Sequence, residues 1–206
     1  GNDSITAGAG ADVIDAGTGN DVIDAGDGND TITAGTGNDN ITGNTGDDKI
    51  IFDVNLTNAD TVNGAGGADV LTFTDNATGT NDLDNVTNVE TITLGNAVTS
   101  VTTVDGLVAG GVSLTVDATA LTAGNTLTWN GAPESNGSFS ITGGAANDTI
   151  TGGAGADTIS AGDGNDAITS GGGNDSITAG AGADVIDAGA GNDVIDGGDG
   201  NDTITA

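Results

Sequence analysis

Apolar and polar residues alternate along much of this chain in short runs that return every nine residues. In each run an isoleucine stands between two neighbours that are often Thr or Asp, as in Thr31-Ile32-Thr33. Alternation over a few residues is typical of a short β-strand with one buried face. A Gly-x-Gly segment precedes nearly every run and supplies the positive-φ freedom that a tight turn requires. The pattern therefore predicts one strand and one turn for every nine residues.

Two blocks of the chain keep this period strictly, and an aspartate marks every unit. The unit reads x-G-x-G-[NA]-D-x-I-x, with isoleucine always two residues after the aspartate. The marking aspartates are Asp3, Asp12, Asp21, Asp30, Asp39 and Asp48 in the first block, and Asp148, Asp157, Asp166, Asp175, Asp184, Asp193 and Asp202 in the second. A strict internal repeat decides the architecture before local propensities are weighed.

The nine-residue unit predicts an all-β fold, a parallel β-roll or β-solenoid with a divergent β-rich middle segment. If each unit forms half a coil, two units make one turn, with isoleucines stacked between two parallel sheets and glycine turns along both edges. Aspartates of alternate units then form columns at each edge, roughly 4.8 Å apart from coil to coil. We expect the roll blocks at residues 1–51 and 143–206, with the divergent segment at residues 52–142.

The middle segment loses the strict period without losing its strand character. Two further units at residues 58–72 carry Asp60 and Asp69 and are shifted by three residues from the first block. Residues 88–94, 112–116 and 126–129 alternate cleanly and predict strands. No part of the sequence predicts a helix.

Stacked carboxylates create an electrostatic problem for this fold. Two unit charges about 5 Å apart repel by about 0.8 kcal/mol in water and by about 3 kcal/mol at an effective dielectric constant of 20. A typical domain has only about 5–15 kcal/mol of stability, so the columns need cations. Calcium suits carboxylates and turn carbonyls better than magnesium does. The chain has no Cys and no His, which argues against zinc or copper.

The repeat resembles the RTX family of calcium-binding β-rolls, whose unit is G-G-x-G-x-D-x-U-x. Residues 152–160, Gly-Gly-Ala-Gly-Ala-Asp-Thr-Ile-Ser, match that unit in full, whereas Asn44 replaces a glycine late in the first block. The resemblance implies several Ca²⁺ ions, each bridging the turns of adjacent coils.

By this resemblance the carboxylate ligands are the thirteen marking aspartates together with Asp60 and Asp69. The turn backbone ligands it implies are at Gly8, Gly10, Gly17, Gly19, Gly26, Gly28, Gly35, Gly37, Gly153, Gly155, Gly162, Gly164, Gly171, Gly173, Gly180, Gly182, Gly189, Gly191, Gly198 and Gly200.

Composition narrows the range of partners. The formal net charge is −30, and Lys49 is the single basic residue, which excludes nucleic acid as a partner. No apolar run approaches the ~20 residues needed to cross a bilayer, so direct membrane insertion is not expected. Without Cys there is no disulfide, and without His or Cys no nucleophile–base pair can be assigned. We therefore expect no enzymatic activity in this chain.

A longer repeat is also visible. Residues 1–34 and 173–206 agree at 32 of 34 positions, including variable ones, which indicates a module of about 172 residues repeated in the parent protein. The sequence thus favours a calcium-binding structural module of a secreted bacterial surface-layer or fibre protein, which self-assembles into a lattice or filament. The alternatives are the rigid stalk of a giant RTX adhesin and the secretion tail of a type I-secreted enzyme or toxin. Ice binding at Gly-Thr-Gly-Asn-Asp turns is disfavoured, because Ala or Asp replaces Thr in many units.

Overall fold

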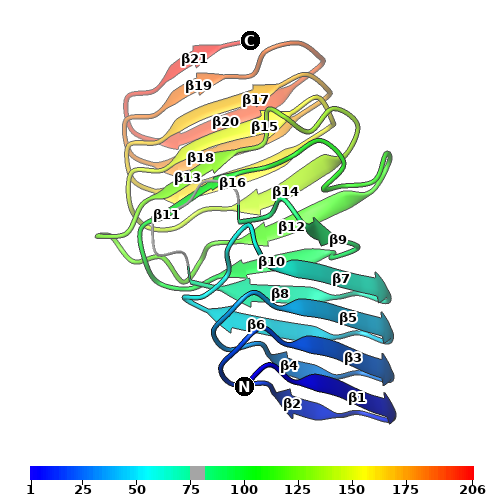
Figure 1. Ribbon diagram of the computed structural model, residues 1–206. Coiled ribbons are helices and arrows are strands. Elements are labelled where there is room, and N and C mark those ends of the chain that lie inside the picture. Colours follow the sequence, from blue (N-terminus) through cyan, green and yellow to red (C-terminus); the bar gives the residue numbers. More distant parts are fainter. Residues whose placement is uncertain (75–81) are drawn as a thin grey trace.

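The chain winds as a solenoid whose strands alternate between two sides of the molecule (Figure 1). The structure is a computed structural model and describes residues 1–74 and 82–206. Every strand pair in it is parallel, and the described residues contain no helix, let alone one able to span a membrane. The all-β parallel solenoid predicted from the nine-residue pattern is confirmed.

One side of the solenoid is a single ten-stranded sheet that runs through both blocks and the middle segment. Its strands are β2 (Val13–Asp15), β4 (Thr31–Thr33), β6 (Lys49–Asp53), β8 (Val70–Phe73), β10 (Thr91–Leu94), β12 (Ser113–Asp117), β14 (Ser138–Thr142), β16 (Thr158–Asp163), β18 (Ser176–Ala181) and β20 (Val194–Asp199).

The opposite side is divided into two sheets, one of five strands and one of six. Each turn of the solenoid contributes one strand to this side, so the chain makes about 11 turns. The five-stranded sheet contains β1 (Ser4–Ala9), β3 (Val22–Asp27), β5 (Asn40–Thr45), β7 (Thr61–Gly66) and β9 (Val86–Thr87). The six-stranded sheet contains β11 (Thr99–Thr102), β13 (Leu127–Asn130), β15 (Thr149–Gly153), β17 (Ala167–Gly171), β19 (Val185–Asp187) and β21 (Thr203–Thr205). The repeat pattern predicts two uninterrupted sheets, and the division between β9 and β11 falls in the segment where the repeat is lost.

Coil length follows the sequence closely. Inside both blocks isoleucines pair with the isoleucine eighteen residues later, as Ile5 does with Ile23. Val70 pairs with Lys49, so the coil through the shifted units is three residues longer, as the sequence predicts. Leu114 pairs with Phe139, which marks the longer coils of the middle segment.

The core is thin in the blocks and thicker in the middle. Isoleucines and alanines fill it in the blocks, and most are fully buried. All four aromatic residues are buried between positions 52 and 139, where the coils are longer. Trp129 packs edge-on against Phe139, with the ring centroids 5.6 Å apart. The three strands predicted in this segment are present as β10, β12 and β13.

The turns stack as closely as the strands do. Gly28 has a φ of +132°, and a Cβ atom there would overlap the carbonyl oxygen of Gly10 in the preceding coil. Asn44 stands at a glycine position and takes a φ of 78°, because asparagine tolerates the left-handed region better than most residues. The departure of Asn44 from the repeat therefore leaves the turn intact.

Equivalent strands in the two copies of the 34-residue segment lie on opposite sides of the solenoid. In the first copy β1 and β3 belong to the five-stranded sheet, whereas their sequence equivalents β18 and β20 belong to the ten-stranded sheet. The intervening chain contributes an odd number of half-coils. A module of this length thus advances the roll by a half-integral number of turns.

Candidate metal sites at the stacked turns

Each repeat aspartate lies in the turn just before a strand, and all of them except Asp3 and Asp12 in the first coil bind the preceding coil through one carboxylate oxygen. Oδ1 of Asp21 accepts a hydrogen bond from the backbone N–H of Asp3 at 2.7 Å, and Oδ1 of Asp39 accepts one from Asp21 at 2.9 Å. At the other edge, Oδ1 of Asp30 accepts from the N–H of Asp12 at 2.8 Å. Each carboxylate thereby ties its coil to the coil before it.

This bonding places the fifteen candidate aspartates in four columns. Those before strands of the ten-stranded sheet are Asp12, Asp30, Asp48 and Asp69, and later Asp157, Asp175 and Asp193. Those before the five-stranded sheet are Asp3, Asp21, Asp39 and Asp60, and those before the six-stranded sheet are Asp148, Asp166, Asp184 and Asp202.

The second oxygen of most of these carboxylates is buried without a hydrogen-bond partner. This holds for Oδ2 of Asp12, Asp21, Asp30, Asp39, Asp48, Asp69, Asp166, Asp175 and Asp184. Leaving a buried polar group unpaired costs about 1–3 kcal/mol, and more for a charged one. Nine such oxygens, arranged in columns, are the donor set that a hard, oxygen-binding cation would satisfy. The residues present therefore fit calcium.

Three of the candidate aspartates differ from the rest because both of their oxygens are paired. Oδ2 of Asp148 accepts from Gly144 N–H at 2.9 Å, and Oδ2 of Asp157 accepts from Gly153 N–H at 2.8 Å. Oδ2 of Asp60 accepts from the N–H and the hydroxyl of Thr57. The sequence gives no reason to separate these three from the others, but none of their carboxylate oxygens lacks a hydrogen-bond partner.

Burial disfavours the charged form of several column carboxylates. Desolvation, with the charges of Asp48 and Glu90 nearby, raises the pKa of Asp69 to about 6. Desolvation likewise raises the pKa of Asp157 and of Asp166 to about 6. It also raises the pKa of Asp39, Asp48 and Asp148 above the ordinary aspartate value. The columns are thus electrostatically strained when no cation is bound.

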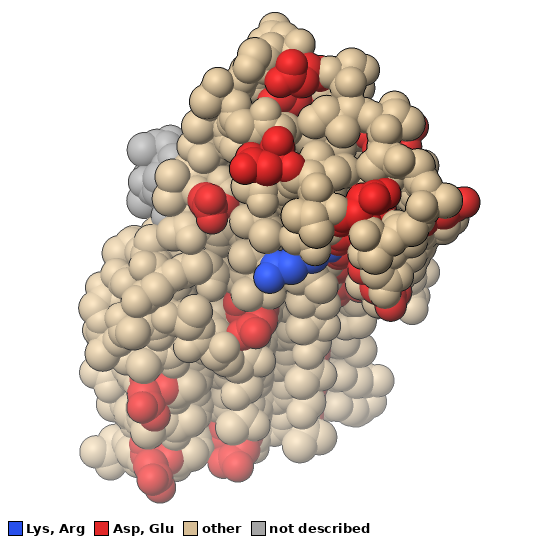
Figure 2. Space-filling view, turned by 90° about the horizontal axis from the view of Figure 1, so that it is seen from below, with Lys and Arg blue, Asp and Glu red and all other residues tan. Residues whose placement is uncertain are grey.

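The chain supplies almost no positive charge of its own to relieve this strain. The single basic side chain, Lys49, is exposed, and Figure 2 shows one basic residue among separate acidic patches. Within residues 1–74 and 82–206, the one ion pair joins the N-terminal amine to Asp3 at 3.7 Å. Neutralisation of the columns must come from outside the chain.

A cation held here would need backbone ligands as well as carboxylates. No group of three acidic side chains converges on one point within the described chain, whereas Ca²⁺ takes 6–8 oxygen ligands. Gly-x-Gly segments precede most of these aspartates by two to four residues, so their carbonyl groups belong to the same stacked turns. These carbonyls are the available source of the remaining ligands.

A second ladder in the turns runs in the opposite direction. Oδ1 of Asn2 accepts from Asn20 N–H at 2.9 Å, and Oδ1 of Asn20 accepts from Asn38 N–H at 3.0 Å. In the second block Oδ1 of Asn147 accepts from Asn165 N–H at 2.8 Å. Sequence reasoning assigned no role to these residues, although asparagine just before the aspartate is a repeated signal. The asparagines fasten each turn to the following coil, whereas the aspartates fasten it to the preceding one.

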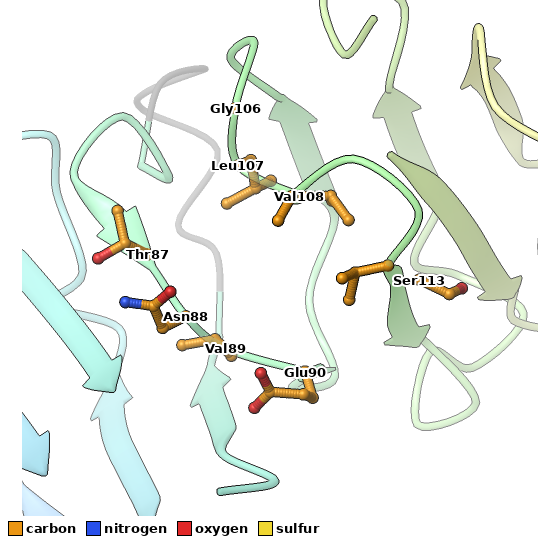
Figure 3. Close-up of a pocket in the computed structure, with 10 residues that line it drawn as sticks. Thr87, Asn88, Val89, Glu90, Gly106, Leu107, Val108 and Ser113 are labelled. Carbon is orange, nitrogen blue, oxygen red and sulfur yellow. The ribbon is translucent and has the colours of Figure 1, made fainter. Parts of the chain in front are cut away.

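Two glutamates of the middle segment are also functional candidates that the sequence did not reveal. Oε2 of Glu90 accepts from Asp69 N–H at 2.7 Å and so extends one column by a coil. Glu90 also lines a cavity of about 360 Å³ with Val89, Leu107 and Val108 (Figure 3). The second candidate is Glu134, whose side chain is fully buried and lies outside the aspartate columns.

Comparison with known proteins agrees with this geometry. No curated protein is similar enough to count as a match. The sequence model of the RTX calcium-binding nonapeptide repeat matches residues 1–32, 24–53, 57–73, 142–177 and 169–204, which together make up more than half of the chain. The chain therefore belongs to the RTX calcium-binding nonapeptide repeat family.

Proposed function

We propose that this chain is a calcium-loaded structural module of a secreted bacterial cell-surface protein, which folds and self-assembles outside the cell. The observation that carries the proposal is the set of nine buried carboxylate oxygens without partners, stacked along the turns of a roll. A fold that leaves these charges unpaired is costly without a cation, and becomes favourable once cations bridge the coils.

The proposed ligands are the fifteen column aspartates together with carbonyl groups of the adjoining Gly-x-Gly turns. The nine aspartates with an unpaired oxygen are the strongest candidates. Extracellular calcium modules commonly have dissociation constants of about 10⁻⁴–10⁻³ M. Sites in that range stay empty at low cytosolic calcium and fill outside the cell, so the chain would leave the cell unfolded and fold afterwards.

A structural role is favoured over a catalytic one by the composition and the long repeat. Carboxylates of the repeat are committed to inter-coil hydrogen bonds, and the sequence has no His or Cys. Duplication of a segment at an offset of 172 residues supports an extended array rather than a short secretion tail. The stalk of a large adhesin remains the second candidate, since an array of rolls would also serve as a rigid spacer.

We expect that removing charge from the columns weakens stabilisation by calcium. Asp21→Asn combined with Asp184→Asn keeps the Oδ1 acceptors but removes two carboxylates. Losing two sites at a tenfold excess of calcium over Kd costs about 3 kcal/mol, so the melting temperature in calcium should fall by about 5–10 °C. Without calcium the variant should be at least as stable as the parent, because like-charge repulsion is reduced. Thermal denaturation with and without calcium measures both effects.

The matched control is Asp15→Asn combined with Asp187→Asn. Both residues are exposed on strand faces and lie outside the columns, so the control makes the same change in net charge. If the two double variants lose equal calcium-dependent stability, the assignment of the columns as ligands is wrong.

The metal-free fold should become more stable as the pH falls towards 5. Asp69, Asp157 and Asp166 have a pKa of about 6 in the folded chain, against about 3.9 in an unfolded one. The folded chain therefore binds more protons in this window, and the free energy of unfolding falls as the pH rises from 4 to 6. Between pH 5 and 7.5 the difference is on the order of 4 kcal/mol for the three groups.

Melting curves in a chelator at both pH values check this expectation. Because protons compete with calcium for the same carboxylates, the added stability due to calcium should shrink over the same window. If the metal-free chain loses stability on acidification from pH 7.5 to 5, the electrostatic strain inferred for the column carboxylates is wrong.

Self-assembly is best tested by electron microscopy of a protein containing several copies of the module, first with calcium and then after chelation. Ordered fibres or sheets that form only in calcium are the expected result. Dispersed rods in calcium would favour the adhesin stalk instead.

A further inference from the structure

The carboxylate columns stop in the middle of the solenoid. At one edge, Leu114 and Phe139 stand where the register would place an aspartate, between Glu90 and Asp157. At the other edge Thr99 and Leu127 take the place of aspartates before Asp148. The coils that contain these residues span positions 91–142, which we call the central segment.

The central segment contains none of the electrostatic strain found in the blocks. Every residue of the segment is described by the structure, and no carboxylate oxygen in it is buried without a partner. The one buried side-chain nitrogen or oxygen of the segment without a hydrogen-bond partner is the indole Nε1 of Trp129. These coils therefore lack the feature that makes the blocks depend on a cation.

Glu134 joins two successive turns at the edge where the blocks have an aspartate column. Its Oε2 accepts from the N–H groups of Gly106 and Val108, both at 3.1 Å. Its Oε1 accepts from the N–H groups of Asn136 and Gly137, both at 3.2 Å. The side chain is fully buried, and its charge is stabilised by four backbone dipoles, because hydrogen bonds to a charged group are stronger than neutral ones.

Two further sets of hydrogen bonds link the turns of the central segment. Asp105 accepts from the N–H and the hydroxyl of Ser135, at 3.2 and 2.6 Å. At the other edge, Oδ1 of Asn96 accepts from the N–H of Thr122 at 3.1 Å and from Nδ2 of Asn125 at 2.7 Å. The turns of the central segment are thus linked by hydrogen bonds that leave no buried carboxylate oxygen without a partner.

The central segment also has the larger apolar core. Trp129 and Phe139 are fully buried, as are Leu94, Leu114 and Leu127 to within 2 %. The apolar side chains that the blocks bury are isoleucine and alanine alone over most of their length. Since hydrophobic stabilisation follows the apolar area removed from water, each central coil gains more from folding than a block coil does.

We propose that the central segment is a calcium-independent nucleus on which the two calcium-dependent blocks fold. The inference rests on the proposed function, because it assigns the calcium requirement to the blocks alone. In a solenoid each coil contacts only its neighbours, and folding propagates outward from whichever coils are stable first. A folded centre offers β8 and β16 ready-made strand edges, at β10 and β14 respectively. Calcium then extends the roll in both directions instead of nucleating it.

Hydrogen exchange followed by mass spectrometry on the full chain, with calcium and with a chelator, tests this proposal. The expected result is that amides of β12, β13 and β14 stay protected in both conditions. Amides of β3–β5 and β17–β19 should exchange at least 100-fold faster in the chelator. In the chelator, the emission of Trp129 should remain that of a buried indole.

Two other outcomes separate the possible failures. If the whole chain exchanges in the chelator and is protected in calcium, the nucleus is overturned while the calcium-dependent function stands. If the whole chain is equally protected in both conditions, the proposed calcium-dependent folding itself is contradicted, and with it the inference.

The role of Glu134 is tested by Glu134→Gln. The substitution replaces one carboxylate oxygen, which accepts from two backbone N–H groups, by an NH₂ group that can only donate. Central protection in the chelator should fall at least tenfold. The matched control is Asp117→Asn in the same segment, because the hydrogen bonds of Asp117 go to Thr119 in its own turn. Equal protection in the two variants would overturn the role of Glu134 in holding the nucleus together.

Discussion

Repulsion between stacked carboxylates is the constraint on which the rest of this structure depends. Thirteen of the fifteen column aspartates accept a hydrogen bond from the preceding coil, and in nine of the fifteen the second carboxylate oxygen is buried without a partner. One basic residue cannot neutralise 31 acidic ones. The same columns that align the coils therefore oppose folding until cations are bound. This cost is the physical basis of the proposed folding on calcium binding outside the cell.

The turns and the thin core follow from the same arrangement. Coils must approach closely for an aspartate to bond to the preceding turn, and at Gly28 that approach leaves no room for a Cβ atom. Isoleucine and alanine suffice as core residues because each coil is narrow, and the aromatic residues occur where the coils lengthen. The half-integral number of turns between the two copies of the repeated segment places identical sequences on opposite sides of the roll.

The period of the sequence was sufficient to predict the solenoid, the eighteen-residue coil and the columns, because a strict repeat has few ways to bury its isoleucines. It also predicted the three-residue shift at Asp60 and Asp69, which the pairing of Lys49 with Val70 confirms. It could not distinguish Asp148 and Asp157 from the other aspartates, since their extra hydrogen bonds depend on the local path of the turn. The role of Glu134 could not be predicted from the sequence either, because the four N–H groups that donate to it come from two turns separated by nearly thirty residues. The division of one side into two sheets lies where the repeat disappears, and no periodic argument applies there.

The most direct test of calcium-bridged columns is a far-ultraviolet circular dichroism titration of the chain with calcium, with magnesium, and with sodium chloride at matched ionic strength. Coordination by buried carboxylates and turn carbonyls predicts a cooperative gain of β structure with calcium, at concentrations near 10⁻⁴–10⁻³ M. Neither magnesium nor sodium should reproduce that gain at the same concentrations. An equal gain with all three salts would show that screening of charge is sufficient, and would contradict calcium ligation by the aspartate columns.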